Sequence, residues 1–447
     1  MEDGIGAKVM HHHKKTGLGL VSLVALGAGS AIGVSIFSVL GPAARVAGSG
    51  LLLSLVLAAV PMMLFALCYA DLARRYPVSG ASYEWPRRYL HPVIGFSVAW
   101  MRIIANIGAM TVLASVLVGY LSPILECPVK PTMFVVIAGI FGLNILGVRS
   151  AAHLQTALMA VLLVVLAAFT LGGGFMVRWH AFSWMPDHGF MAVLAAVSVM
   201  VSLFMGIEAP VELGDEIRDA RRTIPLAIAL SVLLTALAYA AVAATSLALL
   251  GSDGLGRSQA PLADAGARIW GRFAGGVISV VAVVSILKSM NATAMIFSRM
   301  IYAMGRSGAL PPWLGQIHPR FGTPHRATLV AGLFALSGLL LPSGLVFLLL
   351  AVNVPTLLKY MACSASAVRA SRTDETGCGG LFRAPVMTAT GTAAIILAGL
   401  LLLLSVWEDW RPAALAAAWL IVGFVWYRFF ATRTGMNFPP ESEIGSK

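Results

Sequence analysis

Glycine and serine interrupt the first long apolar run of this chain, between Leu26 and Phe37 (LGAGSAIGVSIF). These residues are unfavourable inside a helix, where a glycine costs about 1 kcal/mol relative to alanine. A helix that breaks inside a membrane exposes backbone N–H and C=O groups, which are tolerated only where they are buried in protein or line a cavity. The stretch is therefore a candidate for backbone contact with a ligand.

A second interruption, at residues 205–210 (MGIEAP), follows five apolar runs later. Two interrupted helices at corresponding places in two halves of a chain are the best sequence indication of a transporter's binding site. The alternative is that the glycines only allow helices to pack closely. The matching positions of the two breaks favour the binding site.

The two breaks provide complementary charge for a small solute. The N-terminal end of a helix carries about half a positive charge and attracts anions, while the opposite end attracts cations. We expect the amides of Gly33–Ser35 to hold a carboxylate, and the carbonyls of Ala28–Gly29 and Met205–Ile207 to hold an ammonium group. The candidate substrate-binding residues at the breaks are Ala28, Gly29, Ser30, Ile32, Gly33, Val34, Ser35, Phe204, Met205, Gly206 and Ile207.

Several charged residues lie within predicted apolar runs. A charge at the centre of a membrane helix costs about 2.5–3.5 kcal/mol even on lenient scales, so each needs a partner or a cavity. Glu208 either titrates and contacts the unwound backbone, or only caps amides of the break. Lys288 either titrates or pairs structurally with Glu208 or a carbonyl group. Arg102 lines the pathway or extends toward the cytoplasmic interface, and Lys359 serves the site or pairs structurally. The candidate coupling residues are Glu208, Lys288, Ser289 and Arg102.

The composition is that of an integral membrane protein. Of the 447 residues, 59% are hydrophobic and 11% are charged, whereas soluble domains carry about 25% charged residues. Lys and Arg outnumber Asp and Glu by 31 to 19, but they occupy short connections and form no basic domain of the kind that binds nucleic acid. The four cysteines are scattered without metal-type spacing. We expect no metal site, no cofactor and no nucleic-acid partner.

Twelve apolar runs are long enough to cross a bilayer, and we expect nearly all of them to be helical. They fall at about 17–40, 49–70, 93–121, 132–148, 153–177, 190–213, 224–250, 273–304, 327–342, 344–368, 385–406 and 412–431. The two tails and the connections after even-numbered runs hold twenty Lys and Arg residues, against seven in the other connections. This asymmetry predicts that both termini are cytoplasmic.

The predicted fold class is an all-α membrane protein with twelve transmembrane helices. Runs 1–5 and 6–10 each open with a broken helix. Because five is an odd number, the second copy enters the membrane in the opposite orientation, as an inverted repeat. The predicted parts are a tail at 1–16, the first repeat at 17–177, the second repeat at 178–370, two C-terminal helices within 371–431 and a tail at 432–447.

Four stretches resemble the amino acid/polyamine/organocation (APC) permeases, and the likeness covers about residues 16–435. Residues 29–37 (GSAIGVSIF) are similar to the family's G-x-x-I-G-S-G-I-F sequence, and residues 69–83 (YADLARRYPVSGASY) resemble the end of its second span. Residues 204–225 resemble the signature of the sixth span, and residues 298–311 the end of the eighth. The resemblance implies the leucine-transporter fold, with ten core helices plus two.

The chain departs from the family pattern at functional positions. The Gly-Ser-Gly triplet reads GVS at 33–35, which either narrows the carboxylate site or indicates a ligand without this group. Resemblance to arginine/agmatine exchangers implies aromatic residues at Ser202 and Thr293, and we add these two small residues to the substrate-binding set. Proton-coupled members carry a lysine in the fifth span, which this chain lacks. Lys288 lies beside Ser289, where sodium-coupled relatives place hydroxyl ligands. Our hypothesis is that Lys288 takes the role of the missing lysine of the fifth span.

The sequence favours a secondary amino acid transporter of the cell (inner) membrane. It would work by alternating access, as a proton-coupled symporter or an exchanger, with a small solute, the lipid bilayer and protons as its partners. The alternative is an amine or polyamine transporter of the same fold, which the altered triplet favours and the buried cations oppose. A channel would show rings of like residues, and a membrane enzyme would show a catalytic constellation. The sequence contains neither pattern.

Overall fold

The computed structural model describes most of the chain, and the regular elements in this part are all helical. The described residues are 20–32, 35–78, 80–122, 125–146, 152–176, 187–208, 210–211, 220–320, 322–342, 344–373 and 383–431. The predicted tails at 1–16 and 432–447 lie outside these ranges, as do Gly33 and Val34.

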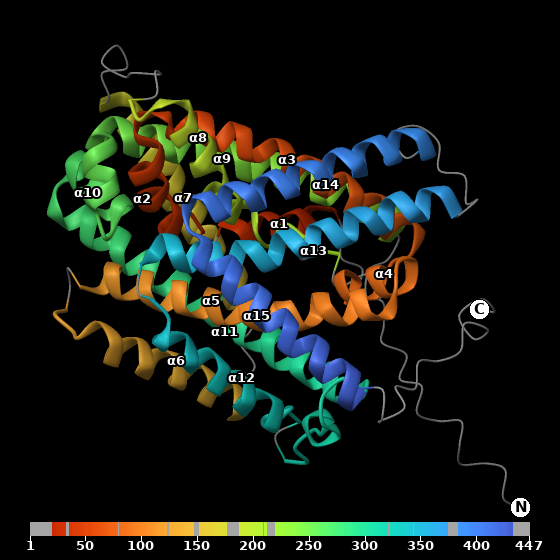
Figure 1. Ribbon diagram of the computed structural model, residues 1–447. Helices are drawn as coiled ribbons and strands as arrows, with labels where there is room; N and C mark the ends of the chain where they lie inside the picture. The colour runs from red at the N-terminus through yellow and green to blue at the C-terminus, as the bar shows by residue number, and fades with distance from the viewer. Residues whose placement is uncertain are drawn as a thin grey trace, which may run out of the picture.

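Every predicted apolar run overlaps a helix (Figure 1). The helices are α1 (Leu20–Ile32), α2 (Ser35–Ala47), α3 (Leu51–Arg75), α4 (Ala81–Tyr89), α5 (Pro92–Leu121), α6 (Val129–Leu146), α7 (Ala152–Met176), α8 (Gly189–Met200), α9 (Ala220–Arg257), α10 (Pro261–Trp270), α11 (Arg272–Arg306), α12 (His325–Ser337), α13 (Leu345–Thr373), α14 (Ala384–Glu408) and α15 (Trp410–Trp426). Within the described residues, 7 helical stretches are long and apolar enough to cross a membrane, and shorter apolar helices lie at 129–145, 160–175, 189–204 and 325–340. The chain is an all-helical, multi-pass membrane protein.

The second predicted interruption is present, and at the first the structure describes a helix on each side of Gly33 and Val34. Helix α1 ends at Ile32 and α2 begins at Ser35. Helix α8 tightens into a 3₁₀ turn, η3 (Val201–Phe204), and the chain then leaves the helix through turns at 205–208. Gly206 has a φ of +102°, a conformation that glycine adopts at little cost because it has no Cβ. The backbone conformation at this break therefore explains why residue 206 is a glycine.

Three long helices, α5, α11 and α13, form a wall beside the broken helices. Helix α5 packs against both α11 and α13, while α1 and α3 pack against α9. The backbones of α5 and α13 come close at Gly108, where a Cβ atom would lie 2.9 Å from Cγ2 of Val352. Figure 1 shows α6 and α12 along one edge of the molecule and α3, α8 and α14 along the opposite edge.

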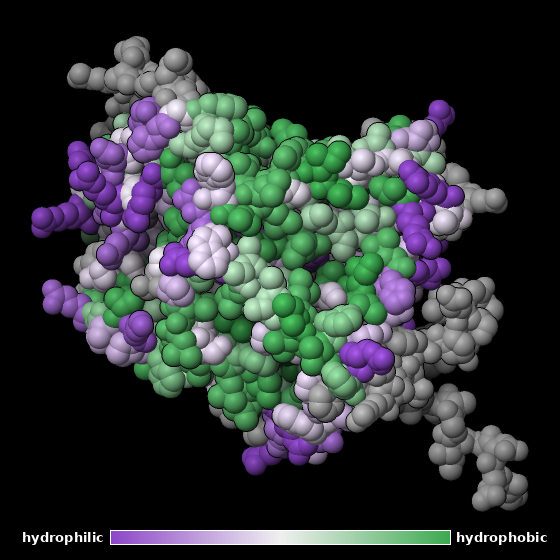
Figure 2. Space-filling model, viewed as in Figure 1, coloured by the Kyte–Doolittle hydropathy of each residue, from purple (hydrophilic) through white to green (hydrophobic). Residues whose placement is uncertain are grey.

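The outer surface is apolar in the middle and polar at two ends. Figure 2 shows hydrophobic side chains over the centre of one face and hydrophilic side chains gathered at both ends. Large apolar side chains are exposed on α6, α12 and α14, among them Val135, Leu333 and Leu403. Apolar patches of this extent mark a surface that contacts a membrane.

Two tryptophans attach α15 to α5. Nε1 of Trp100 donates to the carbonyl of Trp419 over 2.8 Å, and Nε1 of Trp419 donates to the carbonyl of Trp100 over 3.0 Å. Their rings stack with centroids 5.1 Å apart. This reciprocal pair fixes a C-terminal helix to one of the three wall helices.

Replacing Trp419 by phenylalanine should therefore lower the free energy of unfolding by about 1 kcal/mol, because one buried hydrogen bond is lost while the ring is retained. The measurement is denaturant unfolding in mixed micelles. Trp407, whose side chain is 80% exposed, provides the matched control: Trp407→Phe should leave stability unchanged. Equal stability of the two variants would show that the reciprocal bonds do not hold α15 in place.

Candidate functional site

A cavity of about 300 Å³ lies between the two helix interruptions and the wall formed by α5, α11 and α13. This volume is at the lower end of the usual range of ligand pockets, about 300–1,000 Å³, and suits a small solute. Six predicted substrate-binding residues line it, namely Gly29, Ser35, Ser202, Met205, Gly206 and Thr293. Three predicted coupling residues, Arg102, Lys288 and Ser289, line it as well. The structure thus brings together residues from four distant parts of the sequence.

Four other predicted residues, Ala28, Ile32, Phe204 and Ile207, do not line this cavity. Their side chains are buried. The ring of Phe204 packs edge-on against Tyr239, with centroids 6.4 Å apart. A helix turns by about 100° per residue, so the neighbours of a cavity-lining residue face other helices. Gly33, Val34 and the side chain of Ser30 lie outside the described part of the chain.

The first break presents acceptors at one helix end and donors at the other. The last four carbonyls of α1 and the first four amides of α2 have no partner within their own helices. The Tyr239 hydroxyl of α9 donates to the carbonyl of Ala31 over 2.6 Å and so satisfies one of these groups. Gly29 and Ser35, on the two sides of the break, face the cavity. Residues of α1 and of α2 therefore border the cavity on the two sides of the first predicted break.

An asparagine of α13 supports the second break. Oγ of Ser202 donates to Oδ1 of Asn353 over 2.8 Å, and Nδ2 of Asn353 donates to the carbonyl of Ser198. The amide of Met205 donates back to the carbonyl of Ser202 over 3.3 Å. Asn353 is fully buried. It was not among the predicted residues, although an amide side chain within an apolar run could have indicated it.

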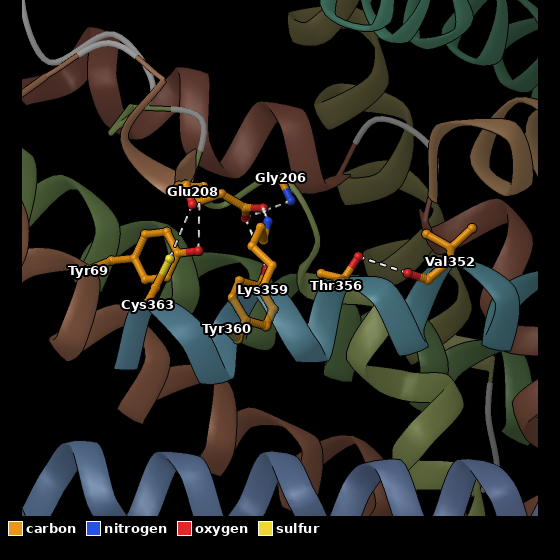
Figure 3. A network of polar contacts seen from close by, with 9 residues as sticks. Tyr69, Gly206, Glu208, Val352, Thr356, Lys359, Tyr360 and Cys363 are labelled. Atoms are coloured by element: carbon orange, nitrogen blue, oxygen red, sulfur yellow. Dashed lines mark hydrogen bonds and ion pairs between the residues drawn. The ribbon is translucent and has the colours of Figure 1, made fainter. Parts of the chain in front are cut away.

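Glu208 joins the second break to α13 (Figure 3). Its Oε1 lies 2.6 Å from Nζ of Lys359. Its Oε2 accepts hydrogen bonds from the Gly206 amide over 3.1 Å and from the Tyr360 hydroxyl over 3.2 Å. The carboxylate thus caps an amide of the break, and its ion-pair partner is Lys359, not Lys288. The sequence indicated that these buried charges need partners, but it did not identify Glu208 and Lys359 as the pair.

A smaller cavity of about 120 Å³ adjoins this ion pair. Glu208 and Lys359 line it, and it shares Arg102, Asn106 and Met205 with the larger cavity. The two hollows therefore lie next to each other along α5 and α13, with Arg102 facing both.

The larger cavity also contains donors that other described residues leave unpaired. Lys288 of α11 faces the cavity, and within the described ranges its ammonium group has no hydrogen-bond or ion-pair partner. In the same part of the chain, the buried Nδ2 of Asn106 on α5 also has no partner. Asn291 on α11, by contrast, accepts a hydrogen bond from Asn144 of α6 over 2.8 Å. An acceptor-rich solute would complete the site.

Replacing Lys359 by methionine should destabilise the protein by about 3–5 kcal/mol, because Glu208 then remains as a buried charge without its ionic partner. The double variant Glu208→Gln with Lys359→Met removes both charges and should recover a large part of this loss. The measurement is the unfolding transition of purified protein in a fixed detergent micelle. If the double variant is as unstable as Lys359→Met alone, the ion pair does not hold the break to α13.

Comparison with known proteins agrees with this architecture. The amino acid permease family matches residues 18–432. An uncharacterized transporter of Mycobacterium tuberculosis is 35% identical over 321 residues, which cover 70% of this chain and 71% of that protein. The branched-chain amino acid permease BcaP of Bacillus subtilis is 26% identical over 97% of both chains. The chloroplastic cationic amino acid transporter 9 of Arabidopsis thaliana is 29% identical over 68% of this chain and 57% of its own length. The chain therefore belongs to the amino acid permease family, within the APC superfamily.

Proposed function

We propose that this permease is a secondary transporter that carries amino acids across the cell membrane by alternating access. The observation that supports this most directly is the cavity between the two interrupted helices, where backbone groups of both breaks and the side chain of Lys288 meet. The names of two relatives assign them branched-chain and cationic amino acids. A zwitterionic solute matches a cavity that borders helix ends of both signs.

In this proposal each charged end of the amino acid has its own part of the site. The α-carboxylate lies against the amides at the start of α2, near Ser35, because that helix end is positive. The α-ammonium lies against the carbonyls at Gly29 and at the break around Met205. Ser202 and Thr293 are small, so they leave the centre of the cavity to the ligand.

The conformational cycle follows from the two halves of the chain. We take residues 17–177 and 178–370 as inverted repeats, with both termini in the cytoplasm as the Lys and Arg distribution predicts. The first two spans of each half then move relative to the third and fourth. The contacts of Glu208 with Lys359 and Tyr360 lie between the second break and α13, so they are contacts that such a movement would change.

Glu208, Lys288, Ser289 and Arg102 are the residues we propose for coupling, in proton-linked symport or in exchange. Lys288 and Ser289 face the substrate cavity, and Arg102 faces both cavities. An amine or polyamine is less suited to this site, since Arg102 and Lys288 would repel an additional positive charge.

Filling the cavity should abolish transport. Thr293→Trp places a large ring in the centre of the cavity and should reduce amino acid uptake into proteoliposomes at least tenfold. Leu333→Trp, on a side chain that is 60% exposed, is the matched control and should transport normally. Size-exclusion chromatography verifies that both variants are folded. If wild-type protein accumulates none of the twenty amino acids above protein-free vesicles, the proposed function is wrong.

A further inference from the structure

We infer that the substrate carries a carboxylate in its side chain, as L-glutamate and L-aspartate do. This inference rests on the proposed amino acid transport and names the substrate class for that site. It follows from the charges and the unpaired donors of the two cavities.

Positive side chains exceed negative ones around the two cavities. Within the described residues, Arg102, Lys288 and Lys359 line them, and Glu208 is the acidic residue that faces them. Both oxygens of Glu208 are already engaged, one by Lys359 and the other by the Gly206 amide and Tyr360. The carboxylate therefore neutralises one cation, and the larger cavity keeps a positive charge at Lys288.

Two donors in the larger cavity need an acceptor. Nζ of Lys288 and Nδ2 of Asn106 have no partner among the described residues, and both residues line this cavity. They lie on α11 and α5, two helices that pack against each other. A carboxylate has two oxygens and about four acceptor positions, so one such group can accept from both donors. A ligand that supplies the acceptor gains hydrogen bonds to donors that the described residues leave unpaired, so such a ligand is preferred.

The α-carboxylate of the substrate does not fill this role in our proposal. It lies with the α-ammonium group at the first break, where Gly29 and Ser35 line the cavity. Lys288 and Asn106 are therefore left to bind the side chain of the substrate. A cationic side chain would meet Lys288 and Arg102, and an uncharged one would leave the Lys288 charge without a partner. L-glutamine has nearly the shape of L-glutamate, so the site must separate these two by charge.

The test compares labelled L-glutamate and L-glutamine as separate substrates in proteoliposomes. At equal, subsaturating concentration, the wild-type protein should take up L-glutamate at least tenfold faster. Lys288→Met should reduce this ratio at least tenfold, and Asn106→Leu should reduce it in the same direction. Lys130, which is exposed at the start of α6, gives the matched control Lys130→Met, whose ratio should equal that of the wild type.

The outcomes separate this inference from the proposed function. If L-glutamine or another neutral amino acid is taken up and L-glutamate is not, the side-chain carboxylate is wrong while amino acid transport stands. The same holds if Lys288→Met and Asn106→Leu, both folded, keep the wild-type ratio. Thermal unfolding gives an independent measure, since a ligand stabilises the state that it binds. L-glutamate should raise the unfolding temperature of the wild type more than L-glutamine does, and stabilisation by L-glutamine alone overturns the inference.

Discussion

Peptide groups that leave a helix inside a membrane must find other partners, because lipid offers none. This chain satisfies them with side chains from distant helices. Tyr239 of α9 donates to Ala31 at the first break, Asn353 of α13 bonds the turn before the second, and Glu208 accepts from the Gly206 amide. The positions of α9 and α13 relative to the breaks therefore depend on these contacts. The backbone groups of the breaks that these side chains leave unpaired border a cavity.

The same contacts determine the electrostatics of the site. Glu208 is fixed by Lys359, Tyr360 and the backbone of the break, so its charge is not available to an additional cation. Lys288 and Asn106 stay as donors without protein acceptors within the described residues. A site lined by small side chains at the breaks and by the cations Arg102 and Lys288 can recognise a solute by its charged groups.

The sequence predicted the helices and the second break well, because apolar runs of membrane length and glycines inside them are local signals. Gly29, Ser202 and Thr293, which the sequence placed in the candidate substrate-binding set, line one cavity. The sequence did not predict that Glu208 pairs with Lys359, since three buried cations were available and the choice depends on how α13 packs. The side chains of Ala28 and Ile32, from the same predicted set, are buried and do not line this cavity, because glycine patterns locate a break without giving the rotation of the helix around it.

Hydrogen–deuterium exchange of the protein in lipid nanodiscs tests the two helix breaks most directly. Amides outside a regular helix that border a cavity exchange faster than amides within continuous helices. We expect rapid exchange at residues 35–38 and 202–208, slow exchange in the middle of α5 and α13, and protection of both rapid segments when a transported amino acid is added. Slow exchange at both segments, equal to that of α5 and unchanged by any amino acid, would contradict the account.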